Sequence, residues 1–187
     1  MFTIGHSTLA SEVFRQALRE NGVQLLVDVR TVPRSRHNPQ FATEALAHSL
    51  QDEGIEYRWM QALGGLRHAR KGSINTGWRN SSFRGYADYM QTGPFQAALE
   101  ILMEADTQTA AAIMCAEAVP WRCHRSLIAD ALTVRGRAVE HIFVNAAGAS
   151  RRKSHALTPF ARVEGARLWY PDPQELPWPE ENAILNV

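Results

Sequence analysis

Lysine is nearly absent from this sequence of 187 residues, and arginine takes its place. Of the 20 basic residues, only Lys71 and Lys153 are lysines and 18 are arginines. Because 19 acidic residues balance them, the formal net charge is only +1. Arginine binds phosphate and carboxylate groups through two parallel hydrogen bonds, which lysine does not do. The excess has two explanations, which are recognition of an anion or a codon bias without structural meaning.

Long apolar runs and a signal-peptide core are also missing. No stretch approaches the roughly 18 apolar residues of a membrane span. The N-terminal residues Met1–His6 have neither a basic start nor an apolar core. The only cysteines, Cys115 and Cys123, are too few for a disulfide framework. We therefore expect a soluble, cytoplasmic protein with no membrane partner.

Apolar residues alternate between strand-like and helix-like spacing along the chain. Strands are predicted at residues 2–4, 25–29, 55–59, 110–114 and 138–144. Two helices are predicted at 10–21 and 43–53, a third begins at residue 94, and a fourth, after the strand at 110–114, ends at residue 135. This order predicts an α/β fold, a single domain over 1–187 with a mainly parallel five-stranded sheet flanked by helices. Residues 1–145 would form the core. A long loop is expected at 61–82 and an irregular C-terminal wrap at 146–187.

Chemically versatile side chains follow several of the predicted strands. Ligands of open parallel sheets bind beyond the carboxyl ends of the strands, so we expect these side chains to meet at one edge. They are His6, Ser7, Asp28, Arg30, Arg34, Arg36, Cys115, Glu117, Cys123, His124 and Arg125.

The segment that begins at Cys115 carries the strongest chemical pattern. A strand ends at this residue, and a helix is predicted to begin near residues 121–122. A thiol beside a helix N-terminus, histidine or arginine has a lowered pKa and becomes a good nucleophile. We therefore predict Cys115 or Cys123 as the nucleophile, with Glu117 and His124 as acid–base groups. The alternative is structural, with buried thiols and a histidine at the top of an apolar helix stripe.

The other residues of this edge are predicted to bind the substrate. They are His6, Ser7, Asp28, Arg30, Arg34, Arg36 and Arg125. Asp28 lies inside an apolar strand, where a carboxylate needs a partner, and Arg30 is available. This pair either fixes the loop or presents a carboxylate at the floor of the site.

The sequence does not predict a zinc site. Cys115, Cys123, His124 and His6 offer suitable sulfur and nitrogen ligands, but their spacing lacks the short chelating pattern of structural zinc sites. On a helix, the adjacent residues Cys123 and His124 would also point about 100° apart. We therefore expect no metal ligands, and the sequence identifies no cofactor.

A basic and aromatic segment supports a different function. Residues 57–87 contain no acidic residue, and they interleave basic with aromatic side chains. The basic ones are Arg58, Arg67, Arg70, Lys71, Arg79 and Arg84, and the aromatic ones include Trp59, Trp78, Phe83 and Tyr86. Such a surface suits a nucleotide or a single-stranded nucleic acid. The alternative is a solvated loop whose aromatic rings cover the core.

Four motifs stand out: Thr3-Ile4-Gly5-His6-Ser7, Leu26-Val27-Asp28-Val29-Arg30, Pro33-Arg34-Ser35-Arg36 with Pro39 and Phe41, and Met114-Cys115-Ala116-Glu117 followed by Cys123-His124-Arg125. Together they resemble the bacterial and archaeal "domain of unknown function 488" family over most of residues 1–145. The resemblance implies a cytoplasmic α/β protein and no established reaction.

A fainter resemblance is to the rhodanese-like sulfurtransferases. Leu26–Arg30 looks like their Asp-Val-Arg strand, and Cys115 followed by Arg125 and a helix looks like their catalytic loop. Ten positions separate Cys115 from Arg125 here, which makes the loop longer than in that family. This departure argues against a persulfide or phosphocysteine mechanism.

The sequence thus favours an enzyme that acts on an anionic substrate, which would be phosphate-, sulfur- or nucleotide-like. Two alternatives remain open. One is a protein that binds or processes nucleic acid through the basic aromatic segment. The other is a metal- or redox-responsive protein that uses Cys115 and Cys123.

Overall fold

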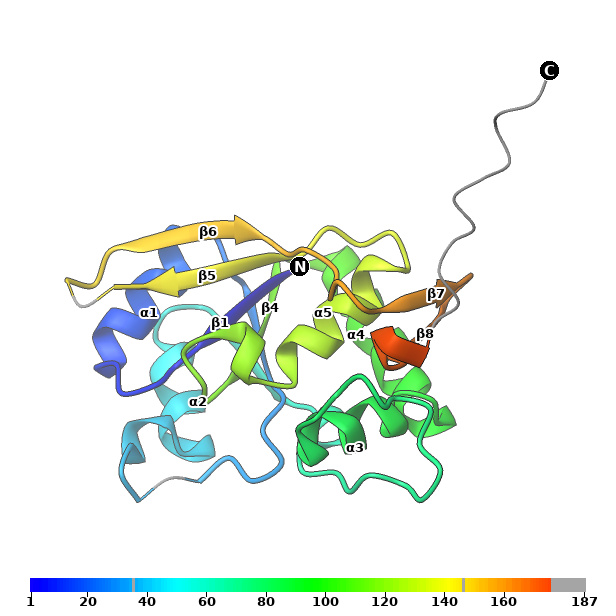
Figure 1. Cartoon of the computed structure of the whole chain (residues 1–187). Helices are drawn as coiled ribbons and strands as arrows, with labels where there is room; N and C mark the ends of the chain where they lie inside the picture. The colour runs from blue at the N-terminus through cyan, green and yellow to red at the C-terminus, as the bar shows by residue number, and fades with distance from the viewer. Residues whose placement is uncertain (35, 146, 176–187) are drawn as a thin grey trace.

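A computed structural model of the chain describes residues 1–34, 36–145 and 147–175. Its centre is a six-stranded sheet with the order β3-β2-β4-β1-β5-β6 (Figure 1). Five strands run parallel: β1 (Phe2–Gly5), β2 (Leu25–Asp28), β3 (Glu56–Trp59), β4 (Ala111–Cys115) and β5 (Glu140–Val144). The predicted α/β class and the mainly parallel sheet are confirmed, and each predicted strand lies where its apolar run indicated.

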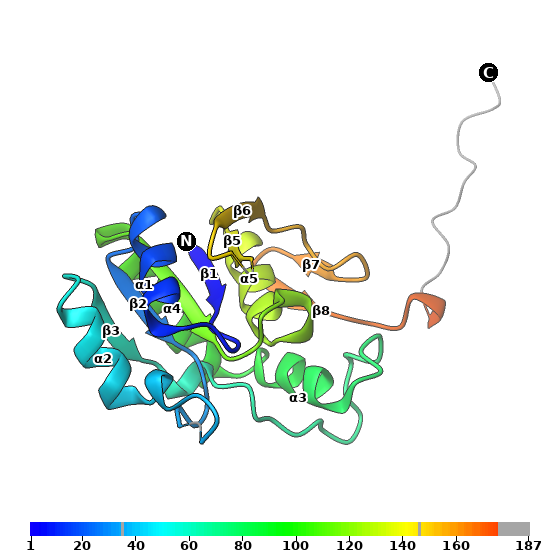
Figure 2. The ribbon, with the colours of Figure 1, turned by 90° about the vertical axis from the view of Figure 1, so that its left-hand side faces the viewer.

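Helices cover both faces of this sheet, as Figure 2 shows from the side. One face carries α1 (Ser11–Glu20) and α2 (Thr43–Gln51), and the other carries α3 (Ser81–Tyr89), α4 (Gly93–Gln108) and α5 (Arg125–Thr133). Each face has its own apolar core. Gly22 and Gly136 follow α1 and α5 with φ of 67° and 77°, the left-handed conformation that glycine adopts at helix ends.

Successive residues of a strand point to opposite faces, and this decides where the first cysteine lies. In β4, Ala112 and Met114 pack into the core beneath α1 and α2. Ile113 and Cys115 therefore belong to the opposite core, with α4 and α5. The thiol of Cys115 faces the start of α5 for this reason.

The sheet has one strand more than predicted. The sixth strand, β6 (Ser150–Ser154), pairs antiparallel with β5, and its sequence Ser-Arg-Arg-Lys-Ser is largely exposed. An edge strand of polar and charged residues has no apolar alternation for the sequence to reveal.

The predicted irregular wrap is also more ordered than expected. It contains β6 and a separate hairpin of β7 (Arg162–Glu164) and β8 (Arg167–Trp169) that turns at Gly165. Residues 176–187 of the wrap lie outside the described residues, as does Ser35 of the Pro33–Arg36 motif.

The predicted loop at 61–82 leads into a helix that the sequence analysis missed. The helix α3 begins at Ser81, where the side chain of Asn80 caps it by accepting hydrogen bonds from the amides of Ser82 and Phe83. The short 3-10 helices are η1 (Pro39–Phe41), η2 (Gln61–Leu63), η3 (Pro120–Arg122) and η4 (Pro173–Glu175). Within the described part of the chain, no helix is long and apolar enough to cross a membrane.

The strand order creates a crevice between two neighbouring strands. β1 and β4 are adjacent, but the chain leaves β1 through α1 on one face and leaves β4 through α5 on the other. Diverging connections leave the space beyond the two strand ends open, and this is where ligands of open α/β sheets bind.

Candidate functional site

A cleft of about 840 Å³ opens at the carboxyl ends of β1 and β4. The predicted residues that line it are His6, Ser7, Arg30, Arg34, Cys115, Glu117, Cys123 and His124. The structure therefore brings most of the predicted residues to one place, as the strand-end argument expected.

Three predicted residues do not line this cleft. Asp28 and Arg125 are buried, and each contacts a residue of the cleft: Asp28 pairs with Arg30, and Arg125 donates to the carbonyl of Glu117. Arg36 is exposed and lines a neighbouring hollow, together with Trp59 and Glu44. Arg34 lines both the cleft and the hollow, whereas Arg36 lines only the hollow.

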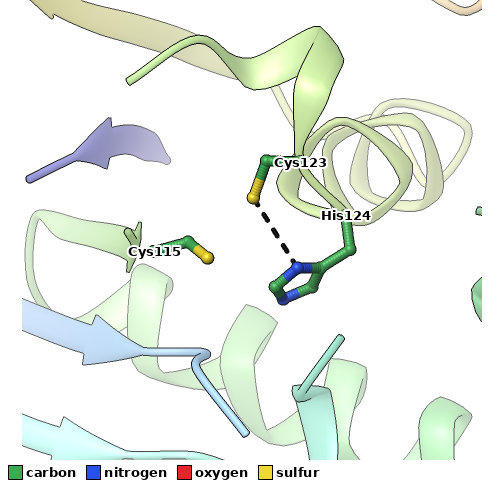
Figure 3. Close-up of side chains that lie close together, drawn as sticks. All are labelled: Cys115, Cys123 and His124. Carbon is green, nitrogen blue, oxygen red and sulfur yellow. Dashed lines mark hydrogen bonds between the residues drawn. The ribbon is translucent and has the colours of Figure 1, made fainter. Parts of the chain in front are cut away.

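Two thiols and one imidazole form the chemical centre of the cleft (Figure 3). Cys115 is 8% exposed and Cys123 is 3% exposed. The two sulfur atoms and a ring nitrogen of His124 all lie within 4.8 Å of one another, and Cys123 Sγ is 3.6 Å from His124 Nδ1. The three atoms converge although Cys115 ends a strand and the other two residues lie just before α5.

Contacts with Val29, Tyr86 and Gly65 fix the imidazole of His124. Nε2 lies 3.0 Å from the carbonyl oxygen of Val29, and because a carbonyl only accepts, Nε2 carries a proton. In the neutral ring, Nδ1 is then the acceptor that faces Cys123. The ring of Tyr86 packs 4.9 Å away, and a Cβ on Gly65 would lie only 2.5 Å from Nδ1. Only glycine leaves room for the imidazole there.

The predicted start of the last core helix near residues 121–122 is wrong. The 3-10 helix η3 occupies Pro120–Arg122, Cys123 is extended with φ −139° and ψ 145°, and α5 begins at Arg125. The break lets Cys123 Sγ accept a hydrogen bond from the amide of Arg125 at 3.5 Å. It also removes the helical-spacing argument against a metal, because Cys123 and His124 do not share a helix.

The two thiols have opposite acidities. Burial alone would raise the pKa of Cys123, but hydrogen bonding with Cys115 and His124 and the charges of His124 and Arg125 lower it well below its usual value. The hydrogen bond to Cys123, together with burial, raises the pKa of Cys115 well above its usual value. Cys123 is therefore the more acidic of the two thiols.

Asp28 and Arg30 form a buried ion pair under the cleft. The guanidinium nitrogen Nη2 of Arg30 lies 2.5 Å from Asp28 Oδ2, and Tyr57 donates its hydroxyl to the same oxygen at 2.8 Å. Arg30 Nη2 also donates to the carbonyl of Phe41 at 2.7 Å. With most of its donors occupied, Arg30 acts as a fixed positive charge at the floor of the cleft.

His6 contacts this ion pair, and its amide donates a hydrogen bond to the carbonyl of Cys115 at 3.0 Å. Nδ1 bonds to the carbonyl of Ser7 at 2.8 Å, the ring stacks on Phe41, and Nη1 of Arg30 approaches Nε2 at 3.3 Å. Burial, with the charge of Arg30 as a further cause, lowers the pKa of His6 to about 4. The ring is therefore neutral near pH 7. Ser7 has φ 45°, a conformation that costs energy outside glycine and recurs at functional sites.

Arg125 begins a buried series of side-chain hydrogen bonds that the sequence did not predict. Its Nη2 donates to the carbonyl of Glu117 at 2.5 Å, and its Nη1 donates to Thr3 Oγ1 at 3.1 Å. Thr3 contacts His141 at 2.8 Å, and His141 contacts His155 at 2.9 Å. Arg125 thereby shapes the loop after Cys115, while the side chain of Glu117 itself is exposed on the cleft wall.

That series of hydrogen bonds ends at Asp130 on α5. This carboxylate accepts from His155, from the amide and hydroxyl of Thr158, and from the hydroxyl of Tyr170. The contributing segments are distant in the sequence, so no motif revealed the cluster. The one sequence signal was Asp130 on an otherwise apolar helix face, where a carboxylate requires partners.

The basic aromatic segment presents few of its rings to solvent. Tyr86 is fully buried, and Trp78 packs against Phe83, Phe160 and Tyr170. Only Trp59 is exposed among the large aromatic residues predicted there. The rings of this segment mainly cover the core.

A family model described as "Domain of unknown function DUF488" matches residues 10–132. No curated protein and no solved structure matches the chain, so the resemblance to rhodanese-like sulfurtransferases gains no support. The matched range contains the cysteine centre, the Asp28–Arg30 pair and most of the cleft. The chain belongs to the DUF488 family.

Proposed function

We propose that this protein is an enzyme that binds an anionic substrate in the cleft and attacks it with the thiolate of Cys123. One observation carries the proposal, which is the surroundings of this sulfur at the floor of the cleft. Cys123 Sγ lies 3.6 Å from His124 Nδ1 and 3.5 Å from the amide of Arg125 at the start of α5. An adjacent imidazole and a helix N-terminus are the groups that activate cysteine nucleophiles.

The neighbouring residues take the remaining roles. His124 accepts the thiol proton at Nδ1, while the bond from Nε2 to the carbonyl of Val29 keeps the ring in place. Cys115 stabilises the thiolate by hydrogen bonding. The protonated His124 then returns this proton to the leaving group, and the Glu117 carboxylate, exposed on the cleft wall, serves as a general base for the incoming acceptor.

The substrate is an anion because the cleft is lined by cationic side chains. Arg34 and Arg122 are exposed on its wall, and Arg30 adds a fixed charge at its floor. Guanidinium groups bind phosphate and sulfate with good geometry, and a cleft lined by one sign of charge raises the local concentration of the opposite sign. We propose a phosphate-, sulfur- or nucleotide-like substrate. Nucleic-acid binding through the segment 57–87 has less support, because most of its rings are packed inward.

Thiol labelling of the chelator-treated protein tests the nucleophile. At neutral pH, iodoacetamide should modify Cys123 faster than it modifies free glutathione, with the labelled residue identified by peptide mass. Inorganic phosphate or sulfate should slow this reaction. Slow labelling of both cysteines in the folded protein would contradict the proposal.

A matched pair of arginine variants tests the anion site. Arg34→Ala should weaken phosphate protection by about tenfold or more, the equivalent of one charge-assisted hydrogen bond. Arg36→Ala is the control, because this equally exposed arginine lines the neighbouring hollow and not the cleft. Equal effects of the two variants would mean that protection reflects general charge and not a site.

A further inference from the structure

The cysteine centre has the composition and geometry of a metal site. Cys115 Sγ, Cys123 Sγ and a ring nitrogen of His124 lie within 4.8 Å of one another. Zinc bonds of about 2.3 Å to sulfur and about 2.0 Å to nitrogen, at a tetrahedral angle, place the two ligand atoms about 3.5 Å apart. The observed distance from Cys123 Sγ to His124 Nδ1 is 3.6 Å. We propose that these three side chains bind one Zn²⁺ ion.

The surroundings of His124 suit a metal ligand. A ligating histidine nearly always donates its other ring proton to a carbonyl or carboxylate, which fixes the tautomer and directs the free nitrogen to the metal. Nε2 of His124 has this partner in the carbonyl of Val29 at 3.0 Å. Figure 3 shows both sulfur atoms on the same side of the ring, and the dashed line joins Cys123 Sγ to Nδ1. Cys123 Sγ in turn accepts the amide of Arg125, a bond that supports a ligating thiolate.

The charges also balance. Zinc binding would place two thiolates and a neutral imidazole around a dication, so the centre has no net charge when loaded. Zinc binding releases the two thiol protons of the metal-free centre, whereas Nε2 of His124 keeps its proton in the bond to the carbonyl of Val29. Arg30 and Arg125 are buried nearby and repel a dication that is not neutralised. Both cysteines are therefore needed.

The fourth position faces the cleft. All three proposed ligands line the same 840 Å³ space, and the cleft supplies room for water or an anion. Three protein ligands with one open position are characteristic of catalytic zinc sites, whereas structural sites are closed by four. The basic residues of the wall favour an anionic fourth ligand.

Zinc and an electrophile would compete for the same sulfur. The lone pair with which Cys123 attacks in the proposed function is the one that it would donate to the metal. The metal site is thus a separate property of the same residues, and it stands whether or not Cys123 acts as a nucleophile.

Metal titration of the full-length, chelator-treated protein tests the inference. We expect one Zn²⁺ per chain, and Co²⁺ in its place should give the sulfur-to-metal absorption and the intense visible bands of a tetrahedral thiolate site. Cys115→Ser and His124→Gln should each weaken the affinity by more than about 100-fold, since even second-shell changes cost 10–100-fold. His48→Ala is the control, an exposed histidine on α2 away from the cleft.

A third variant perturbs the site without removing a ligand. Gly65→Ala keeps every ligand but places a Cβ within 2.5 Å of Nδ1, so it should also weaken zinc binding. A stoichiometry near zero, or unchanged affinity in the folded Cys115→Ser protein, would overturn the metal site.

Labelling in the presence of zinc separates this inference from the proposed function. One equivalent of Zn²⁺ should slow iodoacetamide labelling of the wild-type protein by about tenfold or more, because bound thiolates are poor nucleophiles. Rapid labelling without any zinc binding would refute the metal site and retain the nucleophile. Stoichiometric zinc with slow labelling of the metal-free protein would do the reverse.

Discussion

Two fully buried carboxylates occupy opposite sides of the sheet and are satisfied in different ways. Asp28, at the end of β2, accepts hydrogen bonds from the guanidinium and amide of Arg30 and from the hydroxyl of Tyr57. Asp130, on α5, accepts from His155, Thr158 and Tyr170. Both side chains are 0% exposed. The first has a permanent cation as its partner, whereas hydroxyl, amide and imidazole groups surround the second.

The difference separates a cluster that shapes the cleft from one that holds the C-terminal segment. Removing one member of a buried ion pair leaves the other charge unpaired, which is expensive. Removing one of several hydrogen-bond donors leaves the rest in place and costs less. The Asp28 cluster fixes Arg30 at the cleft floor, and the Asp130 cluster attaches Thr158 and Tyr170 to α5.

The largest effect is expected for Asp28→Asn. This change leaves the guanidinium of Arg30 buried without its counter-charge and should lower the free energy of unfolding by about 3–5 kcal/mol. Urea denaturation followed by circular dichroism measures the loss. Asp130→Asn is the matched control and should cost less, about 1–3 kcal/mol. An equal or larger loss for Asp130→Asn would contradict the expectation that the ion-paired carboxylate contributes more to stability than the hydrogen-bonded one.

The next effect depends on pH and concerns His141, which links Arg125 to the Asp130 cluster. Burial, with the nearby His155 and Arg125, lowers its pKa from 6.5 to about 4. The unfolded chain therefore takes up a proton more readily than the native protein between these values. The resulting stability is present above pH 6.5 and is lost as the pH falls towards 4, by about 2–3 kcal/mol.

The variant His141→Asn should flatten that part of the pH–stability curve. Denaturation at pH 7, 6, 5 and about 4 gives the curve, and the exposed His48→Asn serves as the control. Parallel curves for His141→Asn and the wild-type protein would show that this buried histidine does not govern acid sensitivity.

The smallest effect is expected for Tyr170→Phe, which removes one donor to Asp130. Because the carboxylate keeps its bonds to His155 and Thr158, the expected loss of unfolding free energy is about 1.5 kcal/mol. Tyr89→Phe is the control, since its hydroxyl donates to the carbonyl of Ala62 in a more exposed place. A loss above that of Asp28→Asn would mean that the second cluster dominates stability.

The sequence revealed those parts of the fold that have an apolar pattern. The runs that became β2 and β4 were readable because central parallel strands are covered on both faces and need continuous apolar residues. The strand β6 was not legible, because an edge strand with the sequence Ser-Arg-Arg-Lys-Ser buries little. The helix α3 was missed because its residues follow a long segment rich in glycine and polar residues.

The candidate site was partly legible for a related reason. The residues after β1 and β4 meet because the carboxyl ends of parallel strands share one edge, so His6 and Cys115 could be grouped from the sequence. The position of Arg36 could not be read in this way. It lies two positions beyond Arg34 in a loop that is tied to a residue further along the chain, because the amide of Thr43 donates to the carbonyl of Pro33.

The sequence by itself determined the α/β class, the family and the identity of the chemical groups at the cleft. Only the tertiary structure decided how these groups face one another. The break between η3 and α5 turns Cys123 towards Cys115 and His124, and the carbonyl of Val29 orients the imidazole. Side-chain identity and apolar periodicity are local properties of the sequence. A contact between residues 29 and 124, or 3 and 141, depends on the packing of distant segments, which no local pattern records.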